Sequence, residues 1–271
     1  MSSGKRQRQA AARERVARAQ EEQRRAQRNQ RLVLGGAVVA AVALLAGAVA
    51  YGVVHASSDS GQATTSTVRP TTAADYGKTP CPKGDGSSPR TTTFTSPPKQ
   101  CIDPNNHYSA TFTTSVGTFQ VDLDAQSAPV TVNNFVVLAE YHYYDGTTFH
   151  RVIPGYVVQG GDANGKPPGT GSPGYTIADE FPSSLSDFTA GSLAMANSGA
   201  PHSGASQFFI WVGPNQLPSP HYSLFGKVSS GMGTVVKIEQ GGSPSGTPDK
   251  PVQLLHVAIG QASLTSTSTT T

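Results

Sequence analysis

Residues 32–54 are 23 consecutive positions without a charged side chain, and they separate a basic segment from a polar one. As an α-helix, a segment of this length is roughly 34 Å long, enough to cross a hydrocarbon core of about 30 Å. A cleaved signal peptide is the main alternative, although its apolar stretch is normally shorter, about 7–15 residues. We therefore expect a single transmembrane helix over residues 32–54.

The charges on either side of this segment predict its orientation. Residues 1–31 hold ten of the 20 basic residues and three of the 17 acidic ones, a net charge of +7, which leaves −4 for the remainder. Lys and Arg beside a span stay in the cytoplasm, so we expect a cytoplasmic basic tail and an extracytoplasmic remainder, anchored in the cell membrane. A nucleic-acid partner is not expected because the folded part lacks a basic excess. Binding of nucleic acid by the tail is a weaker alternative.

Residues 55–104 are rich in Ser, Thr, Pro and Gly, a composition typical of a flexible linker. The segment contains both cysteines of the chain, Cys81 and Cys101. Outside the cytoplasm a disulfide is their natural state, and it would close a loop of about twenty residues. Free thiols are an alternative. A metal site is a weaker one, because two cysteines with nearby His107 supply too few ligands.

From residue 105 to 262 the pattern changes to short runs rich in Phe, Val, Thr and Ile, separated by Gly, Pro, Asn and Ser. The expected strands are Tyr108–Thr114, Thr118–Leu123, Thr148–Ile153, Leu193–Ala196, Gln207–Val212, Ser223–Val228 and Val252–Ile259. Helices are expected at Pro129–Tyr141, which begins with a proline suited to a first turn, and at Gly233–Gln240. About seven strands and two helices favour a mainly β domain, a closed antiparallel barrel whose ends the helices cover. Residues 263–271 are expected to be a disordered tail.

A G-x-G-x-x-G pattern occurs at residues 169–174. In a dinucleotide-binding unit this motif follows a strand and begins a helix. Here two prolines precede it, a strand-like run follows it, and Pro173 removes an amide donor from the loop. The pattern therefore predicts a turn-rich loop and no nucleotide site.

His142, Asp145 and His150 are close enough in sequence to be considered as metal ligands. The residues between them are typical of a helix-to-strand turn, and no H-E-x-x-H motif is present. No metal site is therefore expected. Two serines near His202 lack the G-x-S-x-G pattern of a nucleophile elbow, so a serine hydrolase is not expected either.

The segment 149–162 places an arginine among apolar neighbours. In a continuous strand, alternation would put Arg151 on the same face as Phe149 and Ile153. An arginine in that position must be paired or must wait for a ligand. A structural arginine in a half-buried barrel is the alternative. The later segment 206–210 offers two adjacent phenylalanines on opposite faces, one for the core and one for a surface pocket.

Taken together, four segments resemble the cyclophilins, a family of peptidyl-prolyl cis-trans isomerases, over about residues 107–261. They are FHRVIPGYVVQGGD (149–162), LAMANSG (193–199), SQFFI (206–210) and LFGKV (224–228). The loop 169–181 is similar to the bacterial version, so a bacterial membrane-anchored form is expected. The resemblance implies a closed eight-stranded antiparallel β-barrel capped by two α-helices, here preceded by the single transmembrane helix.

The resemblance also implies a role for individual residues. Arg151 matches the family's catalytic arginine, Gln159 its active-site glutamine, and Asn197 a contact to the substrate backbone. The residues expected to bind substrate are Tyr156, Val157, Ala196, Phe209, Leu217 and Tyr222. Gln216 stands where the family has a tryptophan, which affects the expectation of cyclosporin binding more than that of catalysis.

The expected function is therefore peptidyl-prolyl isomerisation of proline-containing polypeptides outside the cytoplasm, with no cofactor and no metal. A binding or chaperone module that grips proline segments with little turnover is the alternative. A structural surface protein with a decayed pocket is a third possibility, which the intact set of pocket residues disfavours.

Overall fold

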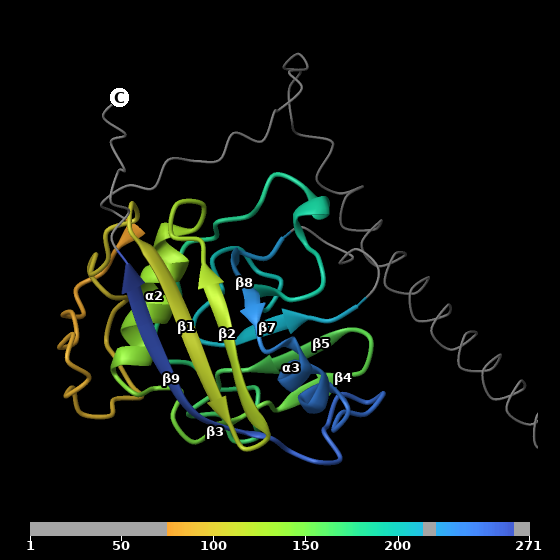
Figure 1. The fold of residues 1–271 in the computed structure, drawn as a ribbon. Helices are drawn as coiled ribbons and strands as arrows, with labels where there is room; N and C mark the ends of the chain where they lie inside the picture. The colour runs from red at the N-terminus through yellow and green to blue at the C-terminus, as the bar shows by residue number, and fades with distance from the viewer. Residues whose placement is uncertain (1–74, 214–220, 263–271) are drawn as a thin grey trace, which may run out of the picture. The chain divides into compact units, whose positions relative to one another are not determined.

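The computed structural model describes residues 75–213 and 221–262, which contain nine strands and two α-helices (Figure 1). The strands are β1 (His107–Thr114), β2 (Gly117–Leu123), β3 (Thr147–Thr148), β4 (Arg151–Ile153), β5 (Val157–Gly160), β6 (Ser192–Met195), β7 (Phe208–Trp211), β8 (Leu224–Ser230) and β9 (Gln253–Ala262). The helices are α2 (Pro129–Glu140) and α3 (Met232–Glu239), and a short 3₁₀ turn, η3, spans Leu185–Asp187. The mainly β fold with two helices is confirmed.

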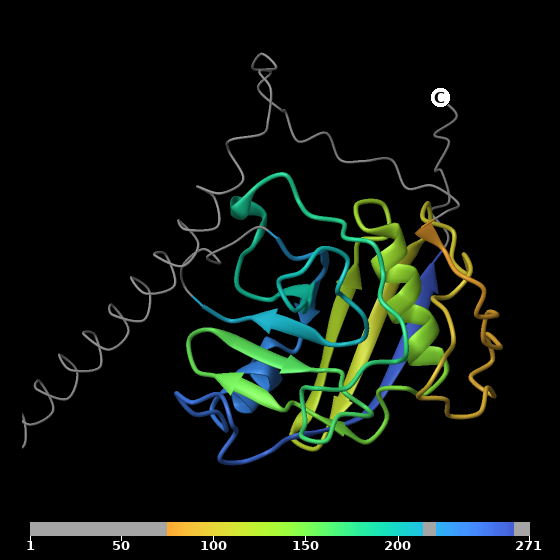
Figure 2. The ribbon, with the colours of Figure 1, turned by 180° about the vertical axis from the view of Figure 1, so that it is seen from behind.

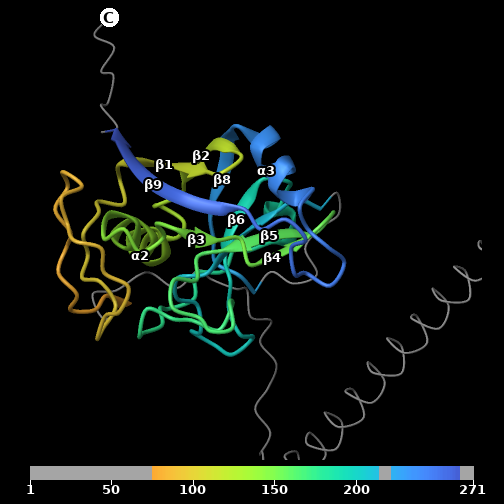
Figure 3. The same ribbon diagram turned by 90° about the horizontal axis from the view of Figure 1, so that it is seen from below.

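All nine strands belong to one sheet in the order β3-β9-β1-β2-β8-β6-β7-β5-β4, and every pairing is antiparallel. The expected closed eight-stranded barrel is therefore wrong: the sheet has nine strands and two free ends, β3 and β4. The views in Figures 1 and 3 show the sheet curled on itself, with α2 and α3 at opposite ends.

The sheet stays open because the single strand expected at 148–153 is interrupted. Thr147 and Thr148 pair with β9, whereas Arg151–Ile153 pair with β5. Between them, the Phe149 ring is fully buried in the core and packs against Phe208 with ring centroids 6.4 Å apart. The amide of Val152 donates to the Gly246 carbonyl and not to a strand. One predicted strand thus becomes the first and the last strand of the sheet.

Helix α2 lies in the mouth of the curled sheet and fills it with Phe135, whose ring centroid lies 5.3 Å from that of Phe225 and 5.9 Å from that of Phe208. Every residue from Val130 to Ala139 is buried. Its first turn has Pro129 and no side-chain cap of its own, and the Glu180 carboxylate accepts hydrogen bonds from the amides of Val130 and Thr131 at 3.0 and 2.8 Å. A distant acid therefore satisfies the free N–H groups that begin any helix.

The described part of the expected linker, residues 75–104, packs along the outside of α2 (Figure 2). The buried Asn133 side chain of α2 accepts from the Cys101 amide at 2.7 Å and donates to the Lys99 carbonyl at 3.0 Å. The Phe94 ring contacts Tyr141 edge-on at 5.4 Å, and the segment contains a disulfide between Cys81 and Cys101. This segment differs from a free linker because a buried polar side chain and a few apolar anchors fix it.

No helix within residues 75–213 and 221–262 is long and apolar enough to cross a bilayer. The expected basic tail, transmembrane helix and C-terminal tail lie outside the described residues. The boundaries proposed for them, and for the folded part at 105–262, stay predictions.

Candidate active site

Arg151 lies on the edge strand β4, opposite Gln159 of β5 in the strand register. Its guanidinium Nη1 donates to Gln159 Oε1 at 3.2 Å, and its Cζ lies 5.8 Å from the centroid of the Tyr156 ring. Among the residues that the structure describes, Arg151 forms no ion pair with an acid. A guanidinium has five N–H donors, so most of them are left for a ligand.

Strand alternation predicts the neighbours of Arg151 only in part. Arg151 and Ile153 are both half-buried and share one face, as expected. Phe149 does not share it, because the chain leaves the strand at Phe149 and turns that ring into the core. The arginine therefore faces outward from the sheet, and the interior side is filled by Val152.

Gln159 connects Arg151 to a residue that the sequence interpretation did not single out, Gln207. Gln159 Nε2 donates to Gln207 Oε1 at 3.2 Å, and Gln207 Nε2 donates to the carbonyls of Gly169 and Gly171 at 3.0 and 3.1 Å. All the donors in this chain point the same way, from the guanidinium toward the glycine loop. The sequence signal that could have identified Gln207 is its position between Ser206 and Phe208, within one of the four characteristic segments.

The glycine loop is built around the carboxylate of Asp162. Burial raises the pKa of this carboxyl, but four backbone N–H donors outweigh burial and hold the pKa below its ordinary value. The donors are the amides of Gly171, Gly165, Gly169 and Asn164. A Cβ atom at Gly165 or Gly171 would collide with the carboxylate. The glycines of the G-x-G-x-x-G pattern thus hold a half-buried acid, in agreement with the expected turn-rich loop.

Beside Arg151, the structure brings most of the predicted substrate-binding residues into one apolar cluster. Phe209 and Val157 are 4% and 3% exposed and pack with the buried Trp211, which is not among the residues expected to bind substrate. Tyr156 meets Trp211 edge-on at 5.0 Å between centroids, and Tyr222 meets Phe209 edge-on at 5.1 Å. The two adjacent phenylalanines face opposite ways as expected, since Phe208 belongs to the main core.

Ala196 and Asn197 follow β6 and line a cavity of about 280 Å³, together with Gln159, Gln207 and the glycine loop. Asn197 also lines a second cavity, of about 310 Å³, which includes Tyr222. Its carboxamide donates to the His221 carbonyl at 2.8 Å and accepts from the Gly199 amide at 3.1 Å. Asn197 therefore joins the two cavities and holds the backbone next to Tyr222.

Two further predictions concern residues at the margin of this site. Leu217 and Gln216 lie outside the described residues, so the expectations for the pocket leucine and for cyclosporin stay predictions.

Burial lowers the pKa of His150, whose ring lies beside Gly169. A neutral His150 imidazole places no second positive charge beside the Arg151 guanidinium. His150 is also separate from His142 and Asp145, with which the sequence analysis had considered it.

The family model for "Cyclophilin type peptidyl-prolyl cis-trans isomerase/CLD" matches residues 109–259. The chain is 41% identical over 149 residues to peptidyl-prolyl cis-trans isomerase-like 1 of Gibberella zeae, covering 53% of this chain and 88% of the relative. It is 40% identical over 149 residues to peptidyl-prolyl cis-trans isomerase ppi1 of Schizosaccharomyces pombe, covering 53% and 92%.

Among solved structures, a cyclophilin type peptidyl-prolyl cis-trans isomerase of Cryptosporidium parvum superposes with a TM-score of 0.52 at 28% identity, covering 57% of this chain and 98% of that one. The same protein in the presence of the dipeptide Ala-Pro superposes with a TM-score of 0.51. The relatives named here are eukaryotic and give no support to the expected bacterial membrane-anchored form.

Proposed function

Because this chain belongs to the cyclophilin-type peptidyl-prolyl cis-trans isomerases, we propose that Arg151 is the group that accelerates the rotation of X-Pro bonds in its polypeptide substrates. The observation that carries this proposal is the position of its guanidinium. It lies beside an apolar cluster, and within the described residues it donates a hydrogen bond to a neutral carboxamide and forms no ion pair with an acid.

The reaction requires no bond to proline to break. Amide resonance holds the X-Pro bond planar, and uncatalysed rotation takes tens to hundreds of seconds. At the twisted transition state the prolyl nitrogen regains its lone pair and becomes a hydrogen-bond acceptor. A guanidinium N–H that donates to this nitrogen binds the twisted state better than either planar state, which lowers the barrier. No cofactor, metal or covalent intermediate is needed for such a step.

The neighbours of Arg151 would bind the two parts of the substrate, the proline ring and the flanking peptide. Val157, Phe209 and the ring of Tyr156 offer an apolar surface for the pyrrolidine ring, and Leu217, which lies outside the described residues, stays a predicted contact for the same ring. Gln159 and Asn197 line the same cavity with polar groups and would hold the flanking peptide. With proline held still on one side and the backbone on the other, only the acyl group between them is free to rotate.

Catalysis and simple binding of proline segments differ in one measurable respect. A catalyst at a small fraction of the substrate concentration speeds the approach to the cis-trans equilibrium and leaves its position unchanged. A binding module shifts the populations only when it is present in amounts comparable to the peptide. We expect the full chain to accelerate relaxation of an Ala-Pro-containing peptide at about 1% of the peptide concentration, with the final cis fraction unaltered. A response that appears only at stoichiometric amounts would favour the binding module.

We further propose that residues 32–54 anchor the isomerase in a membrane, with the basic tail in the cytoplasm and the catalytic domain outside. The support is the uncharged 23-residue stretch next to a segment of net charge +7. A disulfide on the domain side agrees with an oxidising compartment. Protease added to intact cells should remove the domain and leave the tail protected. Protection of the domain, or its release in soluble form, would contradict this topology.

A further inference from the structure

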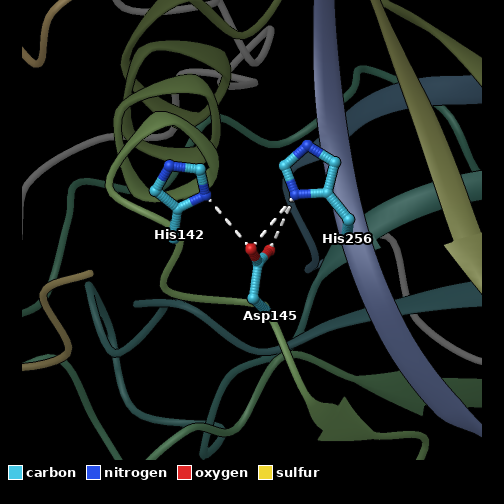
Figure 4. Close-up of side chains that lie close together, drawn as sticks. All are labelled: His142, Asp145 and His256. Carbon is cyan, nitrogen blue, oxygen red and sulfur yellow. Dashed lines mark hydrogen bonds and ion pairs between the residues drawn. The ribbon is translucent and has the colours of Figure 1, made fainter. Parts of the chain in front are cut away.

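Two histidines and an aspartate from two distant segments of the chain meet on the surface beside α2 (Figure 4). His142 and Asp145 come from the turn after α2, and His256 comes from β9. His142 Nδ1 lies 3.1 Å from Asp145 Oδ2, and His256 Nδ1 lies 3.1 Å from both carboxylate oxygens. The side chains are 24%, 26% and 43% exposed, so the cluster is reachable from solvent.

The backbone hydrogen bonds that end helix α2 do not require a histidine at position 142. The His142 amide donates to the Ala139 carbonyl and the Tyr143 amide to the Leu138 carbonyl, the pair of bonds that defines a Schellman motif. His142 occupies the left-handed position of this motif with φ of +55°. Glycine is the usual residue there, because a side chain is strained in that conformation. The imidazole is therefore present at a conformational cost, which points to a use for its side chain.

The hydrogen bonds of His142 require a positive ion between its Nδ1 atom and the Asp145 carboxylate. Its Nε2 lies 3.0 Å from the Gly86 carbonyl, which can only accept, so Nε2 carries a proton. A neutral imidazole has one N–H, and Nδ1 then presents a lone pair to the Asp145 carboxylate, which is also an acceptor. Two acceptors 3.1 Å apart need a positive ion between them, either a second proton on the ring or a metal.

The donor set and its surroundings favour a metal. Imidazole nitrogen with one carboxylate is typical of Zn²⁺ sites, whereas Mg²⁺ and Ca²⁺ prefer oxygen ligands. In a tetrahedral site with bonds of about 2.0–2.2 Å, ligand atoms lie roughly 3.3–3.6 Å apart. The two nitrogen–oxygen separations are 3.1 Å, and all three ligand atoms lie within 4.8 Å of one another. Small side-chain rotations suffice to close the site.

The residues around the cluster also match the environment of a metal site. Metal-bound histidines usually donate their second N–H to a carbonyl or carboxylate, as His142 does to Gly86. We propose that His142 Nδ1, His256 Nδ1 and the Asp145 carboxylate bind one Zn²⁺ ion, with a fourth position open to water.

Such an ion would fasten three parts of the domain that are separate in sequence. It would join the turn after α2 to β9 directly. Through Gly86 it would reach the disulfide-closed loop 81–101, whose Arg90 already donates to the Asp145 carbonyl at 3.1 Å. The site uses none of the residues assigned to isomerisation, so a structural role follows.

The test is a titration of the untagged full chain, freed of metal by a chelator, with Zn²⁺ alone, in competition with a chromophoric chelator. We expect one equivalent to bind and to raise the melting temperature, since a ligand of the native state stabilises it. His256→Gln and Asp145→Asn should each weaken binding by at least about tenfold. His142→Asn should do the same, and asparagine tolerates the left-handed conformation. His107→Gln is the matched control, because His107 is a half-exposed histidine that lies 4.0 Å from Asp122.

X-ray absorption of the zinc-loaded chain provides a measurement that does not depend on any variant folding. Two imidazole nitrogens and at least one carboxylate oxygen at about 2.0–2.2 Å from the metal are expected. Two results would each overturn the proposal. One is zinc binding that the three cluster variants leave unchanged. The other is the absence of saturable binding, in which case a second proton on His142 occupies the position between the side chains.

Discussion

The Arg151 guanidinium and the Gln159 carboxamide face each other across the β4–β5 ladder, with Nη1 and Oε1 3.2 Å apart. Because Gln159 accepts from the arginine, its amide nitrogen is turned toward Gln207, which in turn donates to the carbonyls of the glycine loop. The guanidinium is thus the first donor of a chain whose far end is fixed by backbone. No acid of the described residues forms an ion pair with it.

Gln207 is predicted to position Gln159 and, through it, Arg151. Replacing it with alanine, Gln207→Ala, removes the acceptor for Gln159 and leaves two loop carbonyls without their donor. A hydrogen bond contributes about 1 kcal/mol, so we expect a loss of roughly fivefold in kcat/KM. Because the guanidinium would be less well oriented in the transition state, the loss should fall on kcat more than on KM.

Thr176→Val is the control for this prediction, since Thr176 is exposed and lines the same cavity. It should leave both kinetic constants within about twofold, a limit below the effect of one hydrogen bond. If Gln207→Ala raises only KM, its role is to bind substrate, and the positioning role is wrong.

The Asp162 carboxylate predicts a pH dependence of stability. Its pKa is lowered in the folded chain, so its contribution is complete above the ordinary value of about 3.9 and is lost as the pH falls through the folded value. Asp162→Asn should therefore be less stable than the wild type at pH 6, and the difference in unfolding free energy should shrink below about pH 4. Urea unfolding at a series of pH values measures this difference.

The exposed Asp249 provides the matched substitution, since Asp249→Asn removes a carboxylate from the surface. It should have little effect on the unfolding free energy at any of these pH values. A wild-type minus Asp162→Asn difference that stays constant from pH 6 to about pH 3 would show that backbone donors do not stabilise the charged form.

The Cys81–Cys101 disulfide is predicted to stabilise the domain without affecting catalysis. A closed loop of this length is worth up to about 3 kcal/mol in the chain-entropy account. Its removal in the double variant Cys81→Ser, Cys101→Ser should lower the melting temperature by several degrees. The rate of peptide isomerisation should stay the same, because no residue of the loop lines either of the two cavities beside Asn197.

Reductant provides the complementary experiment on the disulfide. It should lower the melting temperature of the wild type to that of the double variant and leave the variant unchanged. A wild type whose melting temperature is insensitive to complete reduction would mean that Asn133, Phe94 and Ile102 alone hold the segment.

The sequence predicted those elements whose local pattern and tertiary environment agree. Helix α2 lies within one residue of its predicted bounds because Pro129 sets its start and its apolar residues face the core. The strand at 148–153 was predicted as continuous because period-two patterns carry no information about a break. The burial of the Phe149 ring, a tertiary contact, decides where that strand is interrupted.

The packed segment 75–104 escaped prediction for a similar reason. Its composition is that of a linker, and its attachment depends on partners such as Asn133, which lies more than thirty residues away. The family pattern singled out Arg151, Gln159 and Phe209, which lie opposite one another on adjacent strands, and the roles assigned to them stay predictions. Gln207 was missed, and His142 and Asp145 were considered as metal ligands without His256, because side-chain hydrogen bonds between distant strands and turns leave no local signal.

The most direct test of the central claim is kcat/KM for Arg151→Ala in a proline-limited peptide assay, with folding checked by thermal unfolding. We predict a loss of about 10²-fold or more, equivalent to roughly 3 kcal/mol of transition-state stabilisation, at an essentially unchanged melting temperature. Arg151→Lys should also be impaired, because an ammonium lacks the planar fork of donors. A folded Arg151→Ala variant that keeps most of the wild-type kcat/KM would contradict the assignment of catalysis to this guanidinium.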